Sequence, residues 1–205
     1  MPLHHAACLL DALRGHERIV QQLLAAHDPA QQVLHVNDHG TMPIHLAAGI
    51  GDSLIIGQLL AHSPEQQLAH KDAIGNPAML CATACNHVNV MSLLLSRDRE
   101  MCAPVQLVQQ CNNKRCTRLM VAAEQGLTAA VRFLLWHIPD WQVQQVNEDG
   151  CNAPVLAVMA TQDSCGLEVV CLLLRHSPEV QVQLVSHYGV SALVNALMKH
   201  CLDIT

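Results

Sequence analysis

Apolar residues recur along this chain at helical spacing, in stripes that each end in an aliphatic pair. The stripes are Ile55, Ile56, Leu59 and Leu60; Val90, Met91, Leu94 and Leu95; Val131, Leu134 and Leu135; and Val170, Leu173 and Leu174. This spacing places apolar side chains on one face of a helix. A shorter apolar run precedes each stripe, and a turn residue lies between the two: Gly51, Asn86, Gly126 or Gly166. Because Gly and Asn enter left-handed backbone conformations at the lowest cost, the pattern predicts pairs of short helices joined at these residues.

A second motif repeats in step with these helices: an aliphatic pair, then His, Pro and Gln, and later Gly. Its copies are LLAAHDPAQQ, LLAHSPEQQ, LLWHIPDWQ and LLRHSPEVQ. The step is 13 residues in all four, from His27 to Gly40, His62 to Gly75, His137 to Gly150 and His176 to Gly189. In a degenerate copy, LLSRDREMCAPVQ, the corresponding step is five residues longer: it runs from Arg97 to Arg115, which replaces the Gly. We call the residues that end these steps the marker residues: Gly40, Gly75, Arg115, Gly150 and Gly189. They define units of 35, 40, 35 and 39 residues, which indicates a stacked repeat architecture.

The first helix of each unit carries a recognisable signature. TMPIHLAAGIGD, residues 41–52, resembles the ankyrin-repeat signature T-P-L-H-x-A-A followed by Gly, and MPLHHAA (1–7) is a second copy. Other copies keep the frame with fewer matching letters: PAMLCAT (77–83), TRLMVAA (117–123), NAPVLAV (152–158) and SALVNAL (191–197). The resemblance covers the whole chain. It implies an all-α solenoid of helix-turn-helix repeats with short hairpin-like finger loops, in repeats slightly longer than usual.

The repeat register predicts a single array over residues 1–205. Its approximate repeats are 1–36, 37–71, 72–111, 112–146 and 147–185, with a partial repeat at 186–205. Because both ends fall inside a repeat, we expect the chain to be truncated there and to belong to a longer protein. Further insertions precede Gly15 and lie at 161–166.

Most of the extra length lies between the second helix and the next finger. Ser63-Pro64-Glu65 and Ser177-Pro178-Glu179 occur there. Each combines an N-cap residue, a proline suited to the first helical position and an acid suited to the first turn. We therefore predict a short extra helical turn at both places, capped by Ser63 and Ser177.

Composition narrows the class of protein. Half of the chain is hydrophobic (51%) but only 2% is aromatic, so the core must be aliphatic. A charged content of 14% and a net charge of −6 disfavour broad attraction to nucleic acid or an anionic membrane. No apolar run approaches the roughly 18 residues of a membrane span, and the N-terminus lacks the features of a signal peptide. The ten cysteines fall below the density of a disulfide scaffold. They predict buried, reduced thiols in a cytoplasmic, intracellular protein, which we expect to be a monomer.

The histidines suit structural roles better than catalytic ones. His4 and His45 occupy the signature His position, and the resemblance implies that they hydrogen-bond the backbone of neighbouring loops. Leu80, Met120, Val155 and Val194 take that position in the other repeats. The histidines at 27, 62, 137 and 176 follow second helices, where a carbonyl donor or cation is favourable, in preference to a pH-sensitive row. No phosphate-binding loop, H-E-x-x-H motif or local cysteine-nucleophile signature is present, so we expect no enzyme activity, catalytic residue or cofactor.

Zinc binding is the main chemical alternative to a structural role for the histidines and cysteines. His4/Cys8 and Cys81/Cys85 are i, i+4 pairs on predicted helices, and Cys111 and Cys116 flank a finger tip. Structural zinc needs four converging ligands, commonly from C-x2-C knuckles, and the sequence contains none. We therefore expect no metal site; metal-dependent folding stays an alternative that unfolding with and without a chelator tests.

The resemblance implies that a partner protein is gripped by the finger tips and the first-helix surface of the concave face. The tips flank the marker residues, and their chemistry varies between repeats while the frame does not. The predicted partner-binding residues are Asp38, His39, Thr41, Ala73, Ile74, Asn76, Asn113, Lys114, Cys116, Glu148, Asp149, Cys151, His187 and Tyr188. Ile74 and Tyr188 are the preferred anchors, and Trp141 is a further candidate, because apolar and aromatic groups tend to dominate binding energy.

These features predict a non-enzymatic scaffold for protein–protein interaction, with an unidentified protein partner and no nucleic-acid or membrane partner. The alternative is a targeting or autoinhibitory ankyrin segment of a larger enzyme or effector whose catalytic domain lies outside this chain. The sequence flanking Met1 and Thr205 distinguishes the two.

Overall fold

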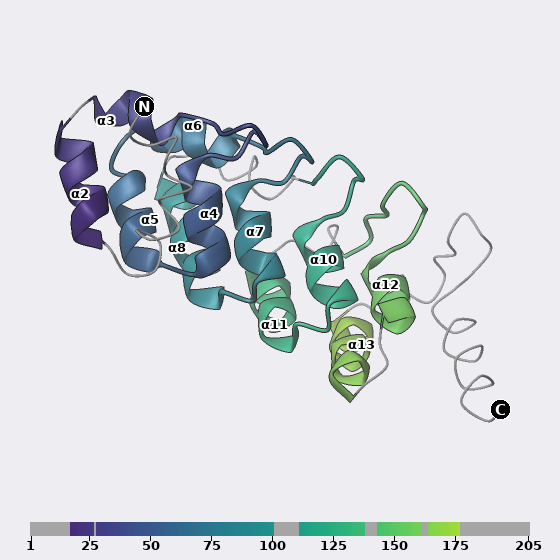
Figure 1. Cartoon of the computed structure of the whole chain (residues 1–205). Helices are drawn as coiled ribbons and strands as arrows, with labels where there is room; N and C mark the ends of the chain where they lie inside the picture. The colour runs from purple at the N-terminus through teal and green to yellow at the C-terminus, as the bar shows by residue number, and fades with distance from the viewer. Residues whose placement is uncertain (1–16, 27, 101–110, 138–142, 161–163, 177–205) are drawn as a thin grey trace. The chain divides into compact units, whose positions relative to one another are not determined.

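The structure is a computed structural model that describes residues 17–26, 28–100, 111–137, 143–160 and 164–176. Within these residues the regular elements are helices, and the one sheet-like feature is an isolated antiparallel bridge between Lys71 and Pro77 (Figure 1). The predicted all-α repeat class is confirmed. The chain divides into two compact units at Asn113 and Lys114, and each is described by itself.

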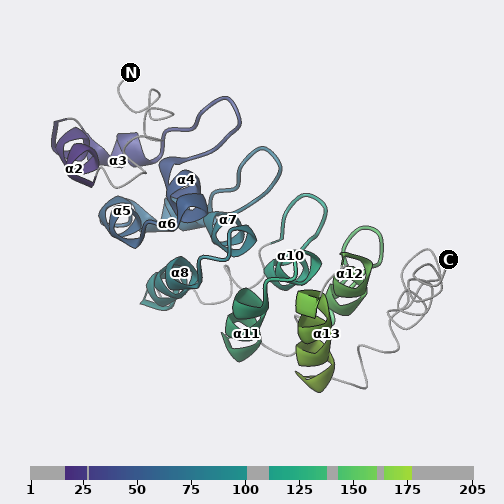
Figure 2. The same cartoon turned by 60° about the horizontal axis from the view of Figure 1, so that its bottom comes forward.

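The first unit contains two rows of helices. Its elements are α2 (Glu17–Ala26), α3 (Pro29–Val33), α4 (Pro43–Ile50), α5 (Ser53–Leu59), α6 (Pro64–Ala69), α7 (Ala78–Ala84) and α8 (Val88–Glu100). The first helices α4 and α7 pack side by side, and the second helices α5 and α8 pack behind them (Figures 1 and 2). Helix α2 packs against α5 and so extends the second row.

The second unit repeats this arrangement. It contains α10 (Arg118–Glu124), α11 (Thr128–His137), α12 (Ala153–Ala160) and α13 (Ser164–His176). The first helices α10 and α12 pack together, and α11 packs against α13 behind them (Figure 2).

The core between the rows is aliphatic, as the composition indicates. Its fully buried large side chains in the first unit include Ile44, Ile55, Ile56, Leu59, Met79, Met91 and Leu94. Ala47, Ala48 and Ala82 have no exposed surface on α4 and α7. Small side chains there let the backbones of the two first helices approach closely, which orients their neighbouring finger loops.

The predicted turns between helices are confirmed at three positions and wrong at one. Gly51, Asn86 and Gly126 have positive φ angles of 88°, 58° and 67°. Gly166 instead lies inside α13, which begins at Ser164, so it makes no left-handed turn. Residues 164–166 of the predicted insertion belong to α13, so the chain does not reverse at that glycine.

The extra helical turn is confirmed at its first position, but without the predicted side-chain cap. Helix α6 begins at Pro64, as expected, but Ser63 has φ 47° and ψ 50° and makes no side-chain hydrogen bond. An N-cap normally has extended backbone, so a left-handed Ser63 cannot fill the role. One repeat earlier, α3 is the counterpart, and Asp28 caps it by accepting a hydrogen bond of 3.0 Å from the N–H of Ala30. The predicted turn at Ser177 lies outside the described residues.

Candidate functional site

Three finger loops share one hydrogen-bonded geometry. In the finger 37–41, the N–H of Asn37 donates to the carbonyl of Thr41 at 3.1 Å, and the N–H of Gly40 donates to the carbonyl of Asn37 at 2.9 Å. Fingers 72–76 and 147–151 repeat both bonds at 2.9 to 3.0 Å. The marker glycines have φ angles of 66°, 82° and 73° in these fingers, so the loop requires a residue that tolerates the left-handed region.

An Asn or Asp side chain closes each of these fingers from within. Its Oδ1 atom accepts two backbone hydrogen bonds of 2.7 to 3.0 Å: Asn37 from His39 and Thr41, Asp72 from Ile74 and Asn76, and Asn147 from Asp149 and Cys151. These anchors are missing from our sequence-based prediction, although the sequence carries a signal for them. An Asn or Asp stands three residues before Gly40, Gly75 and Gly150. Such side chains commonly bond the backbone of a turn.

Backbone hydrogen bonds also join successive fingers within each unit. In the first unit the N–H of Ala73 donates to the carbonyl of His39 at 3.0 Å, and the N–H of Asn113 donates to the carbonyl of Ile74 at 3.2 Å. The Asn113 Nδ2 atom donates a further bond to the carbonyl of Ala73 at 3.2 Å. In the second unit the N–H of Glu148 donates to the carbonyl of Lys114 at 3.1 Å. We call each such row of bonded loops a finger edge.

His70 joins two fingers of the first unit, and His45 packs beside it. The Nε2 atom of His70 donates to the carbonyl of Gly40 at 2.7 Å. His45 is 2% exposed, and the backbone of His70 and Asn76 lies beside its ring, although neither ring nitrogen forms a well-aligned hydrogen bond there. Its ring meets the ring of His70 edge-on, with centroids 5.5 Å apart. His45 therefore lies against the backbone of the neighbouring loop, as its repeat position implies, and it also packs on the residue that bonds Gly40.

Burial dominates the chemistry of His45. Desolvation lowers its pKa to about 4, and the nearby His70 adds to the lowering. Asp72 and the backbone of His70 and Asn76 favour the charged ring, but their effect is smaller. The ring is therefore neutral at pH 7, with no base or nucleophile bonded to it.

Two further histidines bond helix ends. The His87 Nε2 atom donates to the carbonyl of Gly49 at 3.1 Å, near the end of α4, and its ring covers Gly51 so closely that no Cβ fits there. The His137 Nδ1 atom donates to the carbonyl of Phe133 at 2.8 Å in the last turn of α11. For His137 the carbonyl-donor prediction is confirmed.

The structure places the predicted partner-binding residues in three groups. Those with exposed side chains are Asp38, His39, Ala73, Ile74, Asn113, Lys114, Glu148 and Asp149. Thr41 and Asn76 are half-buried, while Cys116 and Cys151 are buried. His187, Tyr188 and Trp141 lie outside the described residues. Ile74 is the large apolar residue of the group, with 65% of its surface exposed at the tip of its finger.

The two finger cysteines point into the protein, unlike their neighbours. Burial raises the pKa of both Cys116 and Cys151, and Asn147 Nδ2 donates to the Cys116 Sγ atom at 3.8 Å. Both side chains are thus buried in the free chain, and their part in partner binding stays a prediction. The six cysteines whose side chains the structure describes are free, but the expectation that they are buried is wrong for Cys85 and Cys171, which are exposed. Cys85 follows the last residue of α7, and Cys171 lies within α13.

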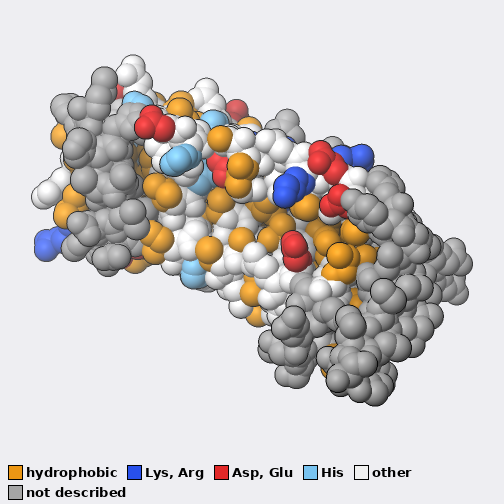
Figure 3. All heavy atoms as spheres, turned by 45° about the vertical axis from the view of Figure 1, so that its right-hand side comes forward, with side chains coloured by type: hydrophobic (Ala, Val, Ile, Leu, Met, Phe, Trp, Pro, Cys, Tyr) orange, Lys and Arg blue, Asp and Glu red, His pale blue; other side chains and the backbone are white. Residues whose placement is uncertain are grey.

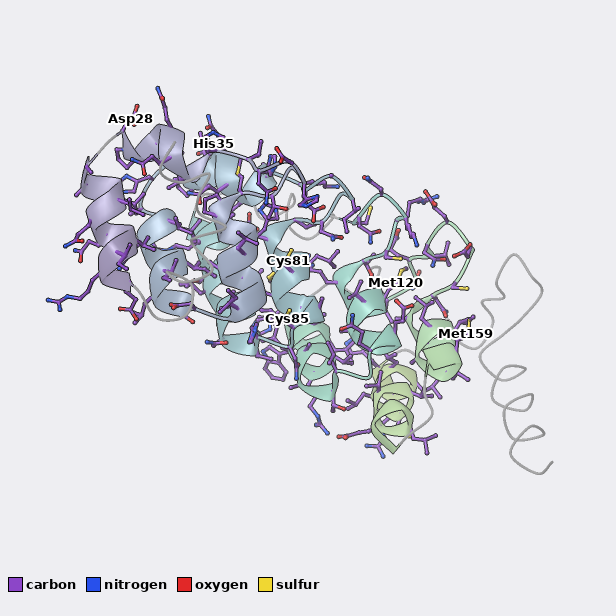
Figure 4. The ribbon with its side chains drawn as sticks, viewed as in Figure 1. Asp28, His35, Cys81, Cys85, Met120 and Met159 are labelled. Atoms are coloured by element: carbon purple, nitrogen blue, oxygen red, sulfur yellow. The ribbon has the colours of Figure 1, made fainter. Side chains whose placement is uncertain are left out.

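The first helices of the first unit add an uncharged face beside the fingers. Leu46 and Ile50 lie one turn apart on α4. Cys81 lies on α7 and Cys85 is the residue that caps its C-terminal end; Figure 4 labels both. Ile50 and Cys85 are exposed, and Leu46 and Cys81 are half-buried. Figure 3 shows hydrophobic side chains interspersed with charged groups of both signs across one face of the molecule.

Neither a metal cluster nor a membrane helix is found where the chain is described. No three His, Cys, Asp or Glu side chains in that part gather as metal ligands. None of its helices combines the length and the apolar character needed to cross a membrane.

The geometry agrees with comparisons to known proteins. A family model for ankyrin repeats matches residues 3–105. Among solved structures, the ankyrin repeat protein EF0377 matches at 21% identity and a TM-score of 0.78, covering 97% of this chain and 94% of that one. The ankyrin repeat domain of Bcl-3, of the IkappaB protein family, matches at 24% and 0.74, covering 98% and 82%. An ankyrin repeat domain from Acinetobacter baumannii AYE matches at 20% and 0.76, covering 99% and 93%. No curated protein matches the sequence.

Proposed function

This chain belongs to the ankyrin-repeat family, and from that premise we propose that it is a non-enzymatic scaffold that binds a partner protein through its finger edges and the adjoining faces of its first helices. Ankyrin repeats are a general protein-interaction module. The finer assignment, to the fingers and to particular side chains, is the proposal.

The observation that carries it is the separation of roles within each finger. The backbone of the finger 72–76 is bonded on both sides, to its own Asp72 and to the neighbouring fingers. Its side chains at Ala73 and Ile74 remain exposed. A loop that is already ordered loses little conformational entropy when a partner binds, so its exposed groups contribute more of their interaction energy to affinity.

Ile74 is the side chain best placed to act as an anchor. Its N–H donates to Asp72 Oδ1 at 3.0 Å, and its carbonyl accepts from the N–H of Asn113 at 3.2 Å. An aliphatic side chain held this way reaches outward without a backbone group that still needs a partner. Such apolar anchors are the residues that dominate interface energies. Tyr188 stays a prediction for the finger that the structure does not describe.

The proposal places the protein in a reducing cytoplasm as a monomer. The free thiols support this location, since exposed Cys85 and Cys171 would cross-link in an oxidising compartment. Size-exclusion chromatography with and without reductant tests it: a dimer that persists in reductant contradicts the monomer.

The test uses two substitutions matched in size and exposure. The full chain serves as bait, bound proteins are identified by mass spectrometry, and affinities are then measured for Ile74→Ala and Leu54→Ala. Leu54 is 62% exposed on α5, in the second row of helices, compared with 65% for Ile74. We expect Ile74→Ala to weaken the partner by at least about fivefold, the effect of roughly 1 kcal/mol, while Leu54→Ala changes little.

Thermal unfolding of both variants provides the control, and both should melt close to the parent chain because each removes an exposed side chain. If Leu54→Ala weakens binding and Ile74→Ala does not, the partner occupies the second-helix face and the finger assignment is wrong.

A further inference from the structure

Arg115 takes the marker position of its finger, where the other described fingers have glycine. Gly40, Gly75 and Gly150 hold this position with φ angles of 66°, 82° and 73°, and Arg115 adopts φ 58°. Glycine enters this left-handed region freely, whereas a residue with a Cβ atom is strained there. The backbone of the finger therefore favours glycine, and the arginine is held in a conformation that lowers stability. Such strain is common where a side chain serves binding.

The side chain of Arg115 has surroundings that suit a group for an external ligand. At Gly40 and Gly75 an added Cβ would lie 3.0 Å and 2.5 Å from the backbone nitrogen of a residue in the next finger, so a side chain gains no room there. Arg115 is exposed. Among the described residues, no carboxylate forms an ion pair with its guanidinium. The charge is therefore available to a partner.

Arg115 also belongs to an unusual pair in the sequence. Lys114-Arg115 is the one place where two Lys or Arg residues are consecutive, and Glu148-Asp149 is the one place where two acidic residues are consecutive. Both pairs lie at finger tips of successive repeats, and all four residues are exposed. The finger edge of the second unit therefore carries charges of both signs.

Hydrogen bonds hold these two tips together. The N–H of Glu148 donates to the carbonyl of Lys114 at 3.1 Å. The Nδ2 atom of Asn147 donates to the Sγ atom of Cys116 at 3.8 Å, and Cys116 is buried directly after Arg115 in the chain. The basic and the acidic pair are thus presented on neighbouring, mutually bonded backbone segments, so their spacing is set before any partner arrives.

A finger edge with both signs of charge selects a partner by its charge pattern. A uniformly acidic segment that pairs with Lys114-Arg115 is repelled by Glu148-Asp149, and a uniformly basic segment meets the reverse. Like charges brought together across an interface reject wrong partners. The planar guanidinium of arginine binds a carboxylate through two parallel hydrogen bonds, a geometry that lysine does not offer. These charges therefore fit a segment in which an acidic and a basic residue lie close together.

We propose that Arg115 is a specificity residue of the finger edge: its guanidinium binds a carboxylate of the partner protein, and Glu148-Asp149 binds a basic side chain of the same segment. The inference rests on the proposed function, because it assigns the chemistry of the partner at that surface. Arginine at this marker makes the finger less stable than glycine would, and it gives the finger a contact that glycine lacks.

Thermal unfolding separates a binding role for Arg115 from a packing role. Arg115→Gly relieves the strained backbone, so its melting temperature should rise by about 2–4 °C. Arg115→Asn should melt at or above the parent temperature, because asparagine enters the left-handed region readily and Asn86 has the same φ of 58°. A lower melting temperature for both variants would show that the arginine stabilises the fold, and it would overturn the proposal.

Random peptides displayed on phage are the probe for the charge pattern, selected in parallel on the full chain and on Arg115→Asn. We expect the segments that the parent enriches and the variant does not to carry an acidic residue close to a basic one. The variant Glu148→Gln/Asp149→Asn should remove the requirement for the basic residue. Arg175→Asn is the control, since Arg175 is an exposed arginine on α13 of the same unit, and it should enrich the same segments as the parent.

The proposal is overturned if the parent and Arg115→Asn enrich the same segments, or if the segments lost on Arg115→Asn contain no acidic residue. Equal losses on Arg115→Asn and Arg175→Asn overturn it too, because they would reflect net charge alone.

Affinity for the captured partner distinguishes this inference from the proposed function. Arg115→Asn should weaken binding at least about fivefold, and the loss should shrink as salt rises from about 0.05 to 0.5 M. If Ile74→Ala weakens binding and Arg115→Asn does not, the finger assignment stands and the role of Arg115 fails. If Arg115→Asn weakens binding and Ile74→Ala does not, the role of Arg115 stands and Ile74 is not the anchor.

Discussion

The side chain of Gln67 caps the helix that precedes its own: its Nε2 atom donates to the carbonyl of Leu59 at 2.7 Å and to the carbonyl of His62 at 2.5 Å. Leu59 is the last residue of α5, and Gln67 lies in α6 with no exposed surface. The last carbonyls of a helix lack intrahelical partners. The Leu59 carbonyl also accepts from the N–H of His62 at 3.1 Å, so Gln67 adds a second bond to it and a bond to the His62 carbonyl. The insertion that lengthens the repeat thus serves as a helix cap.

Gln67→Ala should lower the free energy of unfolding by about 1–3 kcal/mol. The substitution removes two buried hydrogen bonds and leaves the Leu59 and His62 carbonyls without that donor. Urea unfolding followed by circular dichroism measures the change. Gln66→Ala is the control, because Gln66 is exposed in the same helix and should stay within about 0.5 kcal/mol of the parent. Equal midpoints for the two variants would contradict the capping role.

Gly75→Ala should destabilise the protein by at least about 1–2 kcal/mol. Gly75 has φ 82°, which an L-residue adopts at that cost, and an added Cβ would meet the backbone nitrogen of Asn113 at 2.5 Å. Gly57 in α5 has open space around its Cβ position, so Gly57→Ala should instead stabilise by about 0.5–1 kcal/mol through helix propensity. Thermal melts compare the two, and opposite signs are expected. An unchanged melting temperature for Gly75→Ala would mean that the backbone of the finger edge shifts at little cost to accommodate the added Cβ.

Asp72→Ala should open the finger 72–76, whereas Asp72→Asn should preserve it. The alanine removes an acceptor for two backbone N–H groups, at an expected cost of about 1–3 kcal/mol. Asparagine keeps that acceptor, and Asn37 and Asn147 make the same two bonds in their own fingers. Chemical denaturation gives the stability of both variants, and amide exchange at Ile74 and Asn76 reports on the finger. Similar losses in both would show that the carboxylate charge, not the turn bond, is what matters.

Thiol labelling of the native protein should separate the cysteines by depth. At pH 8, iodoacetamide should modify exposed Cys85 and Cys171 first. Cys81 should react at least about a hundredfold more slowly, because burial raises its pKa to about 12 and the thiolate is the reactive form. Fragment spectra distinguish Cys81 from Cys85 within one peptide. In denaturant the two cysteines should label at the same rate. If Cys81 of the native protein labels as fast as Cys85, its thiol is accessible to solvent and the burial described for it is wrong.

The repeating part of the structure could be predicted from the sequence because the same residues recur at the same spacing in successive repeats. The constant step from His to Gly located the left-handed residues of the fingers, and Pro64 located α6. The anchors Asn37, Asp72 and Asn147 carried a comparable signal at constant spacing. Gly166 shows the opposite case, because glycine permits a left-handed turn without requiring one. Helix α13 begins at Ser164, so Gly166 lies inside a helix and not at a turn.

The sequence by itself determined the repeat, its aliphatic core, its helix pairs and most of its turns, because these depend on local conformational preference and on spacing. Only the tertiary structure decided which groups each side chain meets across repeats. His45 and His70 are 25 residues apart in the chain, yet their packing assigns the bond to Gly40 to one and burial to the other. Cys116 and Cys151 turn inward beside exposed neighbours for the same reason. Burial and hydrogen bonding between repeats are properties of the stacked array, and no single repeat contains them.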